Sequence, residues 1–92
     1  MIPKTELIPN TWYIGNSSMT KIAMWEADKQ MFIFGYQYPG SEPDYNRLFY
    51  VDGDPLAFEP LSILSPQLPQ SWTPAQCIRI SNILKTQAEQ DN

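Results

Sequence analysis

The clearest pattern in the chain lies between Met31 and Tyr38, where aromatic side chains fall on every second position. Successive side chains of a β-strand point to opposite faces, so this spacing predicts a strand with an aromatic stripe. Met31 and Ile33 lie on the other face of this strand, beside the small Gly35. A strand that is apolar on both faces is either central in a packed domain or half-exposed as a binding surface. The stripe consists of Phe32, Phe34, Tyr36 and Tyr38.

Shorter runs of β-preferring residues predict four further strands. These strands are residues 11–15, 20–26, 48–51 and 56–59. The turn at 27–29 joins the second run to the aromatic strand as an antiparallel hairpin. Residues 39–47 contain two prolines, a glycine and several polar side chains, which predicts a long loop. Asp52 and Gly53 form a strong turn signal before the last strand.

The end of the chain predicts a helix at about 74–88. Thr73 can cap it, Pro74 suits the first helical position, and Gln76 follows three residues after the cap. Ile78 lies off the apolar stripe of this helix. The stripe recurs at three- and four-residue steps through Cys77, Ile80, Ile83 or Leu84, and Ala88.

Together these elements predict one α+β domain over residues 1–92. Five short strands and a helix favour a small curled antiparallel sheet or a partly open β-barrel, SH3-like or OB-like by analogy. The helix would plug an open end or cover one face. We expect a short helical turn at 61–64. The predicted regions are an extended N-terminal arm at 1–10, the β-sheet region at 11–59, a Pro-rich crossover at 60–72 and the C-terminal helix at 73–90.

Composition removes several classes of function. The net charge of −4 and six scattered Lys and Arg residues argue against direct binding of nucleic acid, which requires clustered cations. The chain has no histidine, which excludes Ser-His triads and imidazole metal ligands. Its single cysteine cannot build a Cys/His zinc site or an internal disulfide. We therefore expect a protein that is not an enzyme and that has no cofactor.

The same absences suggest a compartment. The first residues lack the basic and apolar blocks of a signal peptide. No apolar run approaches the ~20 residues that span a bilayer. We therefore expect a cytoplasmic protein with no membrane partner.

Carboxylates occur in three pairs, each at a spacing of two residues and near a predicted turn. The pairs are Glu26 and Asp28, Glu42 and Asp44, and Asp52 and Asp54. Hairpin order places the first and third pairs at one end of the sheet and the second at the other. An acidic rim of this kind can bind Ca²⁺ or Mg²⁺, or a basic protein surface. Acidic residues also favour turns and keep a small protein soluble. No calcium-loop pattern follows Asp52, so we predict no metal site.

The aromatic residues allow more than one role. The phenylalanines of the stripe suit core packing, and the tyrosines suit a wet end of the strand or a protein contact. Stacking of nucleic-acid bases is disfavoured by the acidic charge. Tyr45 either forms the tip of a recognition loop or folds back onto the sheet edge. Trp72 precedes the helix cap and is expected to pack against Gln76 or Cys77, as in a hydrophobic staple.

The sequence also predicts the environments of two tryptophans and of the single cysteine. Trp12 and Trp25 are predicted to lie in the core. Cys77 lies on the apolar face of the predicted helix, where a free cysteine behaves as a small hydrophobic residue.

The resulting hypothesis is a non-enzymatic interaction module that binds a basic surface of a partner protein. In one variant its acidic rim occupies the nucleic-acid-binding site of the partner, as inhibitors or accessory factors from phages and mobile elements do. The alternative is a structural protein that assembles as a homo-oligomer, with the stripe buried at a two-fold interface. The candidate binding residues are Tyr36, Tyr38, Glu42, Asp44, Tyr45, Asp52, Asp54, Glu26 and Asp28.

Overall fold

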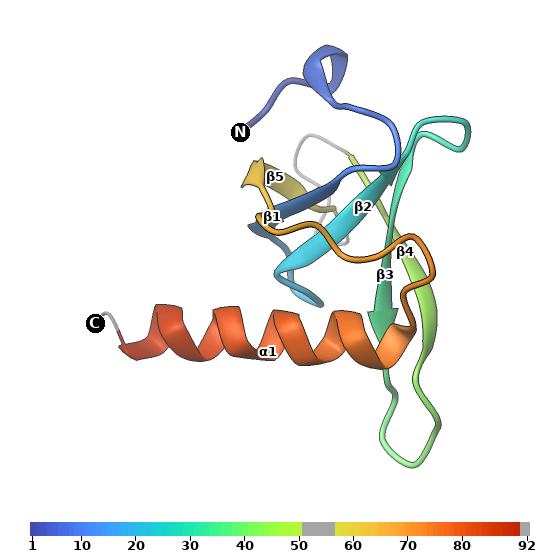
Figure 1. Cartoon of the computed structure of the whole chain (residues 1–92), viewed down its shortest axis with the longest axis vertical. Helices are drawn as coiled ribbons and strands as arrows, with labels where there is room; N and C mark the ends of the chain where they lie inside the picture. Colours follow the sequence, from blue (N-terminus) through green and yellow to red (C-terminus); the bar gives the residue numbers. More distant parts are fainter. Residues whose placement is uncertain (51–56, 91–92) are drawn as a thin grey trace.

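The computed structural model describes residues 1–50 and 57–90 and confirms an α+β fold (Figure 1). Five antiparallel strands form one curled sheet, and a C-terminal helix follows them. No helix in these described ranges is long and apolar enough to cross a membrane. The elements are η1 (Lys4–Glu6), β1 (Trp12–Asn16), β2 (Ile22–Glu26), β3 (Met31–Tyr36), β4 (Asp44–Phe49), β5 (Glu59–Ile63) and α1 (Pro74–Gln90).

The strand order is β4-β3-β2-β1-β5, so β4 and β5 are the edge strands. Residues near the two edges meet at one place. Phe49 forms a parallel bridge with Ala57, and the Phe58 N–H donates a hydrogen bond of 2.9 Å to the Phe49 carbonyl. The sheet is therefore strongly curled but not closed into a barrel.

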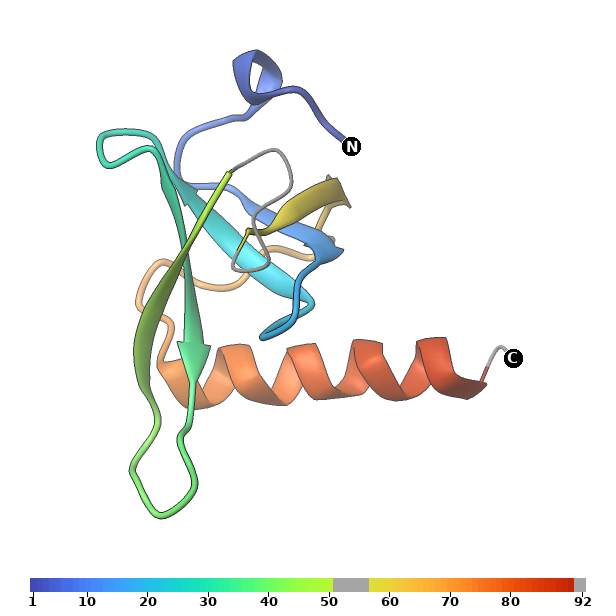
Figure 2. The same ribbon diagram turned by 180° about the vertical axis from the view of Figure 1, so that it is seen from behind.

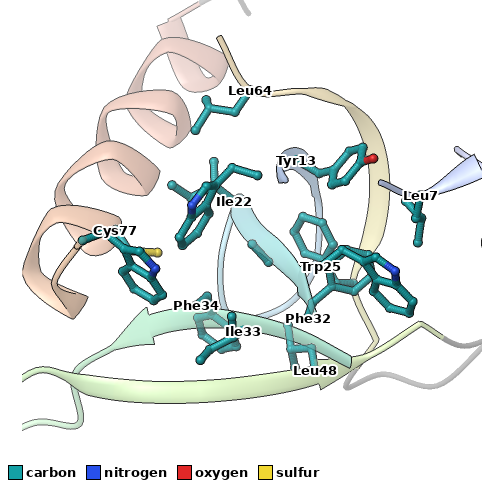
Figure 3. Packing of buried hydrophobic residues seen from close by; sticks show 14 residues of the cluster. Leu7, Tyr13, Ile22, Trp25, Phe32, Ile33, Phe34, Leu48, Leu64 and Cys77 are labelled. Carbon is teal, nitrogen blue, oxygen red and sulfur yellow. The ribbon is translucent and has the colours of Figure 1, made fainter. Parts of the chain in front are cut away.

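One face of the sheet, here called the inner face, lines the inside of the curl. The pairing register and strand alternation place Tyr13, Trp25 and Phe32 on it, and all three are buried (Figure 3). The Phe32 ring lies 4.9 Å from the Trp25 ring and 4.8 Å from the Phe58 ring. Phe58 comes from the approach to β5, so aromatic side chains from separate strands fill the curl.

The opposite face, here called the helix face, carries Trp12, Ile22, Ile33 and Gly35. A Cβ at Gly35 would overlap the backbone of Pro74, so glycine allows α1 to lie directly against β3. The helix therefore covers one face of the sheet, at the end away from the N-terminal arm (Figures 1 and 2).

A second contact fixes α1 to the turn before β2. The Ser81 hydroxyl accepts the Lys21 N–H at 2.8 Å and shares a hydrogen bond of 3.2 Å with the Thr20 hydroxyl. Ser81 is buried, and Leu84 is more buried than Ile83, which is 49% exposed. Sequence periodicity missed Ser81 because the residue is polar.

The predicted start of α1 is confirmed in detail. The Gln76 Oε1 accepts the Thr73 N–H at 2.7 Å, and the Thr73 hydroxyl oxygen accepts the Gln76 N–H at 3.4 Å. This reciprocal pair is a capping box. The helix extends to Gln90, two residues beyond the predicted end.

The helical turn predicted at 61–64 is wrong, because β5 occupies residues 59–63. Of the strand predicted at 56–59, Glu59 begins β5, Ala57 forms an isolated bridge and residue 56 lies outside the described residues. The open edge of β1 pairs with β5. A proline is tolerated in β5 because an edge strand has backbone groups without ladder partners. Gln67 extends the pairing: its side-chain amide accepts the Trp12 N–H at 2.6 Å and donates to the Trp12 carbonyl at 2.9 Å.

Two other boundaries differ from the predictions. β4 begins at Asp44, so the predicted loop at 39–47 is shortened to residues 37–43. The polar residues at the start of β4 gave no strand signal in the sequence, because a strand at the edge of a sheet needs few buried apolar side chains. The arm at 1–10 contains a short 3-10 turn, and its Ile2 N–H donates to the Pro60 carbonyl at 2.8 Å.

Candidate binding site on the β3–β4 hairpin

The β3–β4 hairpin extends past α1, and its loop projects from the body of the molecule (Figures 1 and 2). The pairing register explains this shape. Residues 31–33 of β3 pair with both β2 and β4, whereas residues 34–36 pair with β4 alone among the described strands. The end of the hairpin is therefore a two-stranded ribbon, in which Phe34 and Gly35 remain buried and exposure increases from Tyr36 onward.

The aromatic stripe changes character along β3. Phe32 and Phe34 are fully buried, Tyr36 is half-buried, and Tyr38 is 58% exposed. The rings of Tyr36 and Tyr38 make a T-shaped contact with centroids 4.8 Å apart. The phenylalanine end of the stripe is core, and the tyrosine end is surface.

The two tyrosines border a hollow of about 240 Å³ at the end of the hairpin. The register pairs Tyr36 with Asp44, so their side chains point to the same face of the ribbon. None of the described residues that line the hollow is a lysine or an arginine. The lining residues are Tyr36, Tyr38, Ser41, Glu42, Asp44, Tyr45 and Asn46.

Polar side chains next to the hollow also protect the edge of β4. The Asp44 Oδ1 accepts the Tyr45 N–H at 2.7 Å, and the Asn46 Oδ1 accepts the Arg47 N–H at 2.9 Å. These bonds occupy two backbone donors of an edge strand, which would otherwise be available to another chain. They also hold Asp44 in place beside Tyr36.

Tyr45 lies in β4 and not in a loop, so of the two roles expected for it the recognition-loop tip is wrong and folding back onto the sheet is confirmed. The residue is in β4 opposite Gly35, so its side chain lies on the helix face. Its ring is 4.8 Å from the Trp72 ring, and its hydroxyl donates to the Trp72 carbonyl at 3.3 Å. Tyr45 thus folds back onto the sheet, because Trp72 offers it both an aromatic contact and an acceptor.

Trp72 is buried and packs against Trp12 as well, with ring centroids 4.6 Å apart. Trp12 and Trp25 lie in the core, as predicted.

The acidic pair at the other end of β3 is in a different environment. Glu26 Oε1 accepts a hydrogen bond of 2.7 Å from the Arg47 Nε, and Glu26 Oε2 lies 3.9 Å from the Lys29 Nζ. The charge of Glu26 is therefore compensated, and Asp28 is exposed beside it. Asp52 and Asp54 lie outside the described residues. The nine candidate residues thus do not form one site.

Neither a metal centre nor a reactive thiol is supported by the described residues. Within 1–50 and 57–90, no three His, Cys, Asp or Glu side chains converge closely enough to hold a metal ion. Cys77 points from α1 into the core (Figure 3). Burial raises the pKa of the Cys77 thiol to about 11, although a backbone hydrogen bond with Gly35 acts in the opposite direction. The thiol is therefore protonated near neutral pH and packs as a small hydrophobic group.

No protein-family model matches the chain, and no match was found among the curated proteins or the solved structures. The end of the hairpin combines a projecting loop, a pair of tyrosines and the carboxylates beside them (Figure 1).

Proposed function

We propose that this protein is a non-enzymatic interaction module that binds a basic surface of a partner protein through the end of its β3–β4 hairpin. One observation carries the proposal. Tyr36, Tyr38, Glu42 and Asp44 border the same hollow on a projecting ribbon. This part of the molecule combines exposed aromatic surface with negative charge.

The chemistry of these residues suits protein recognition. Tyrosine offers a large contact area for a small loss of conformational entropy, and aromatic residues often dominate binding energy. Carboxylates steer a basic partner toward the site and make association sensitive to salt. The net charge of −4 adds to that attraction.

The size of the hollow favours a side chain over a cofactor. Pockets for small-molecule ligands usually measure ~300–1,000 Å³. The hollow measures about 240 Å³ and is open to solvent. A single side chain from a partner fills such a space.

The proposal includes a specific variant. The acidic hairpin occupies the nucleic-acid-binding site of a cytoplasmic partner, so the protein acts as an inhibitor or accessory factor of phage or mobile-element type. Such a partner carries the basic surface that the hairpin requires.

Affinity purification from the native host tests the proposal. The tagged protein is compared with a Tyr38→Ala/Glu42→Gln variant, in nuclease-treated lysate. The matched control is Ile8→Ala/Glu6→Gln, which removes an exposed apolar side chain and an exposed carboxylate far from the hairpin. We expect the wild type and the control to retain a partner that high salt releases, and the hairpin variant to lose it. Equal retention by all three proteins, or recovery that depends on nucleic acid, would contradict the proposal.

A second candidate is self-assembly through β5. Leu61 and Ile63 are 47% and 48% exposed on this edge strand. Phe32 and Phe34 are already buried within one molecule, so the edge strand offers more free apolar surface to a second copy than these two residues of the stripe. Light scattering tests this candidate: Ile63→Lys should convert an oligomer to a monomer, and a monomeric wild type rules it out.

A further inference from the structure

The walls of the hairpin hollow suit a flat cation. Tyr36 and Tyr38 meet at an interplanar angle of 78°. In a T-shaped pair the edge of one ring meets the face of the other, and Tyr38 is 58% exposed, so part of its ring surface is open to a ligand. The face of a tyrosine ring attracts a cation within ~6 Å of its centroid.

The carboxylates of the hollow have no compensating cation among the described residues. Glu42 makes no hydrogen bond or ion pair with any described residue. Asp44 uses one of its carboxylate oxygens to accept the Tyr45 N–H. Arg47, on the same strand as Asp44, instead donates to Glu26 at 2.7 Å. The negative charge of the hollow is therefore available to a ligand.

We infer that the hollow receives an arginine side chain of the basic partner. This inference rests on the proposed function. A guanidinium group stacks flat on an aromatic ring and donates hydrogen bonds to a carboxylate through a planar fork. It therefore contacts the tyrosine rings and the carboxylates of the hollow at the same time. The ammonium group of lysine is compact and strongly hydrated, and it stacks less well. Ser41 and Asn46 border the hollow and supply further polar atoms.

The inference is tested by NMR titration with three capped tripeptides, Gly-Arg-Gly, Gly-Lys-Gly and Gly-citrulline-Gly. Citrulline keeps the planar shape of arginine but has no charge. We expect the arginine peptide to shift the amide signals of Tyr36, Tyr38 and Asn46. We expect the citrulline peptide to bind about tenfold more weakly, since one lost charged contact accounts for such a factor. The lysine peptide should fall between the two.

Two variants locate the effect. Glu42→Gln and Tyr38→Leu should each weaken binding of the arginine peptide several-fold, and Glu6→Gln should leave it unchanged. Both substitutions are at exposed positions and leave the core intact. Equal binding of the arginine and citrulline peptides, or signal shifts that do not centre on the hollow, would overturn the inference.

The two proposals fail in different ways. Capture of a partner that depends on the hairpin, without preference for the arginine peptide, overturns the inference and leaves the proposed function standing. The opposite result is that the hollow prefers the arginine peptide, but the hairpin variant still retains the partner as well as the wild type does. That result overturns the proposed function and supports the arginine chemistry of the site.

Discussion

The two ends of β3 show how one sequence pattern produces two different environments. At the turn that joins β2 to β3, Glu26 is held by Arg47 and lies close to Lys29. At the loop that joins β3 to β4, Glu42 and Asp44 face no cation among the described residues. Both acidic pairs have the same spacing in the chain, yet among the described residues only the first contains a carboxylate with a cationic partner.

The aromatic stripe divides at the same place. Phe32 pairs across to Trp25 and Leu48, because β3 lies between β2 and β4 there. Tyr36 pairs with Asp44 at the last position of the β3–β4 ladder. Phe34 also pairs with β4 alone, yet it is fully buried, so distance along β3 from the packed core, and not the number of neighbouring strands, separates core from surface. The hairpin end is thus a candidate binding site because exposure rises from Tyr36 to Tyr38, where the stripe leaves the core.

The first prediction compares the two ends of the stripe. Phe34→Ala should lower the free energy of unfolding by about 3–5 kcal/mol, because it leaves a cavity in the core. Tyr38→Ala should lower it by less than about 1 kcal/mol, because that side chain is 58% exposed. Urea denaturation followed by tryptophan fluorescence measures both values. If Phe34→Ala does not fold, Phe34→Leu serves as the milder variant, and similar small effects at both positions would contradict the comparison.

The second prediction concerns Gly35, which separates the two ends. Gly35→Ala should cost about 3 kcal/mol, because the added methyl group overlaps the Pro74 backbone and forces α1 away from β3. Gly40→Asn is the matched control, since Gly40 has a φ of +82° that asparagine tolerates and open space around it. The control should change stability by less than about 1 kcal/mol in the same urea titration. A tolerated alanine at position 35 would show that α1 does not need this close approach.

The third prediction uses pH to probe the contact between α1 and β3. The pKa of Cys77 rises from 9.0 to about 11 on folding, because burial disfavours the thiolate. A raised pKa stabilises the folded state fully below pH 9, and this contribution is lost as the pH rises through 11. We expect the wild type to lose roughly 2 kcal/mol more than Cys77→Ala over this interval. Parallel denaturation curves at several pH values measure the difference, and identical losses would show that the thiol is not desolvated.

The fourth and smallest prediction compares the two acidic pairs. Glu26→Gln should destabilise the fold by about 0.5 kcal/mol, because it weakens an ion pair at the surface. Glu42→Gln should leave stability unchanged within error, because Glu42 has no partner among the described residues. A double-mutant cycle with Arg47→Gln isolates the Glu26 pair. A measurable loss of stability in Glu42→Gln would mean that the second pair is structural after all.

Sequence reasoning recovered the elements whose signals are local. The capping box at Thr73 and Gln76 involves groups three residues apart, so the start of α1 was predictable to the residue. The alternation from Met31 to Tyr36 likewise depends on neighbouring positions. Sequence reasoning placed Tyr45 in a loop and left its two possible roles open, because its position on β4 depends on a distant contact with Trp72. It failed at β5, whose strand conformation depends on the open edge of β1.

The sequence by itself determined the fold class, the two apolar faces of β3 and the acidic character of the protein. These properties follow from residue type and short-range spacing, which the chain carries in any environment. Only the tertiary structure decided which aromatic side chains are exposed, which carboxylates are neutralised and which candidate residues meet. Those outcomes depend on where α1 and residues 64–72 pack. They follow from contacts between residues far apart in the chain, which local patterns do not encode.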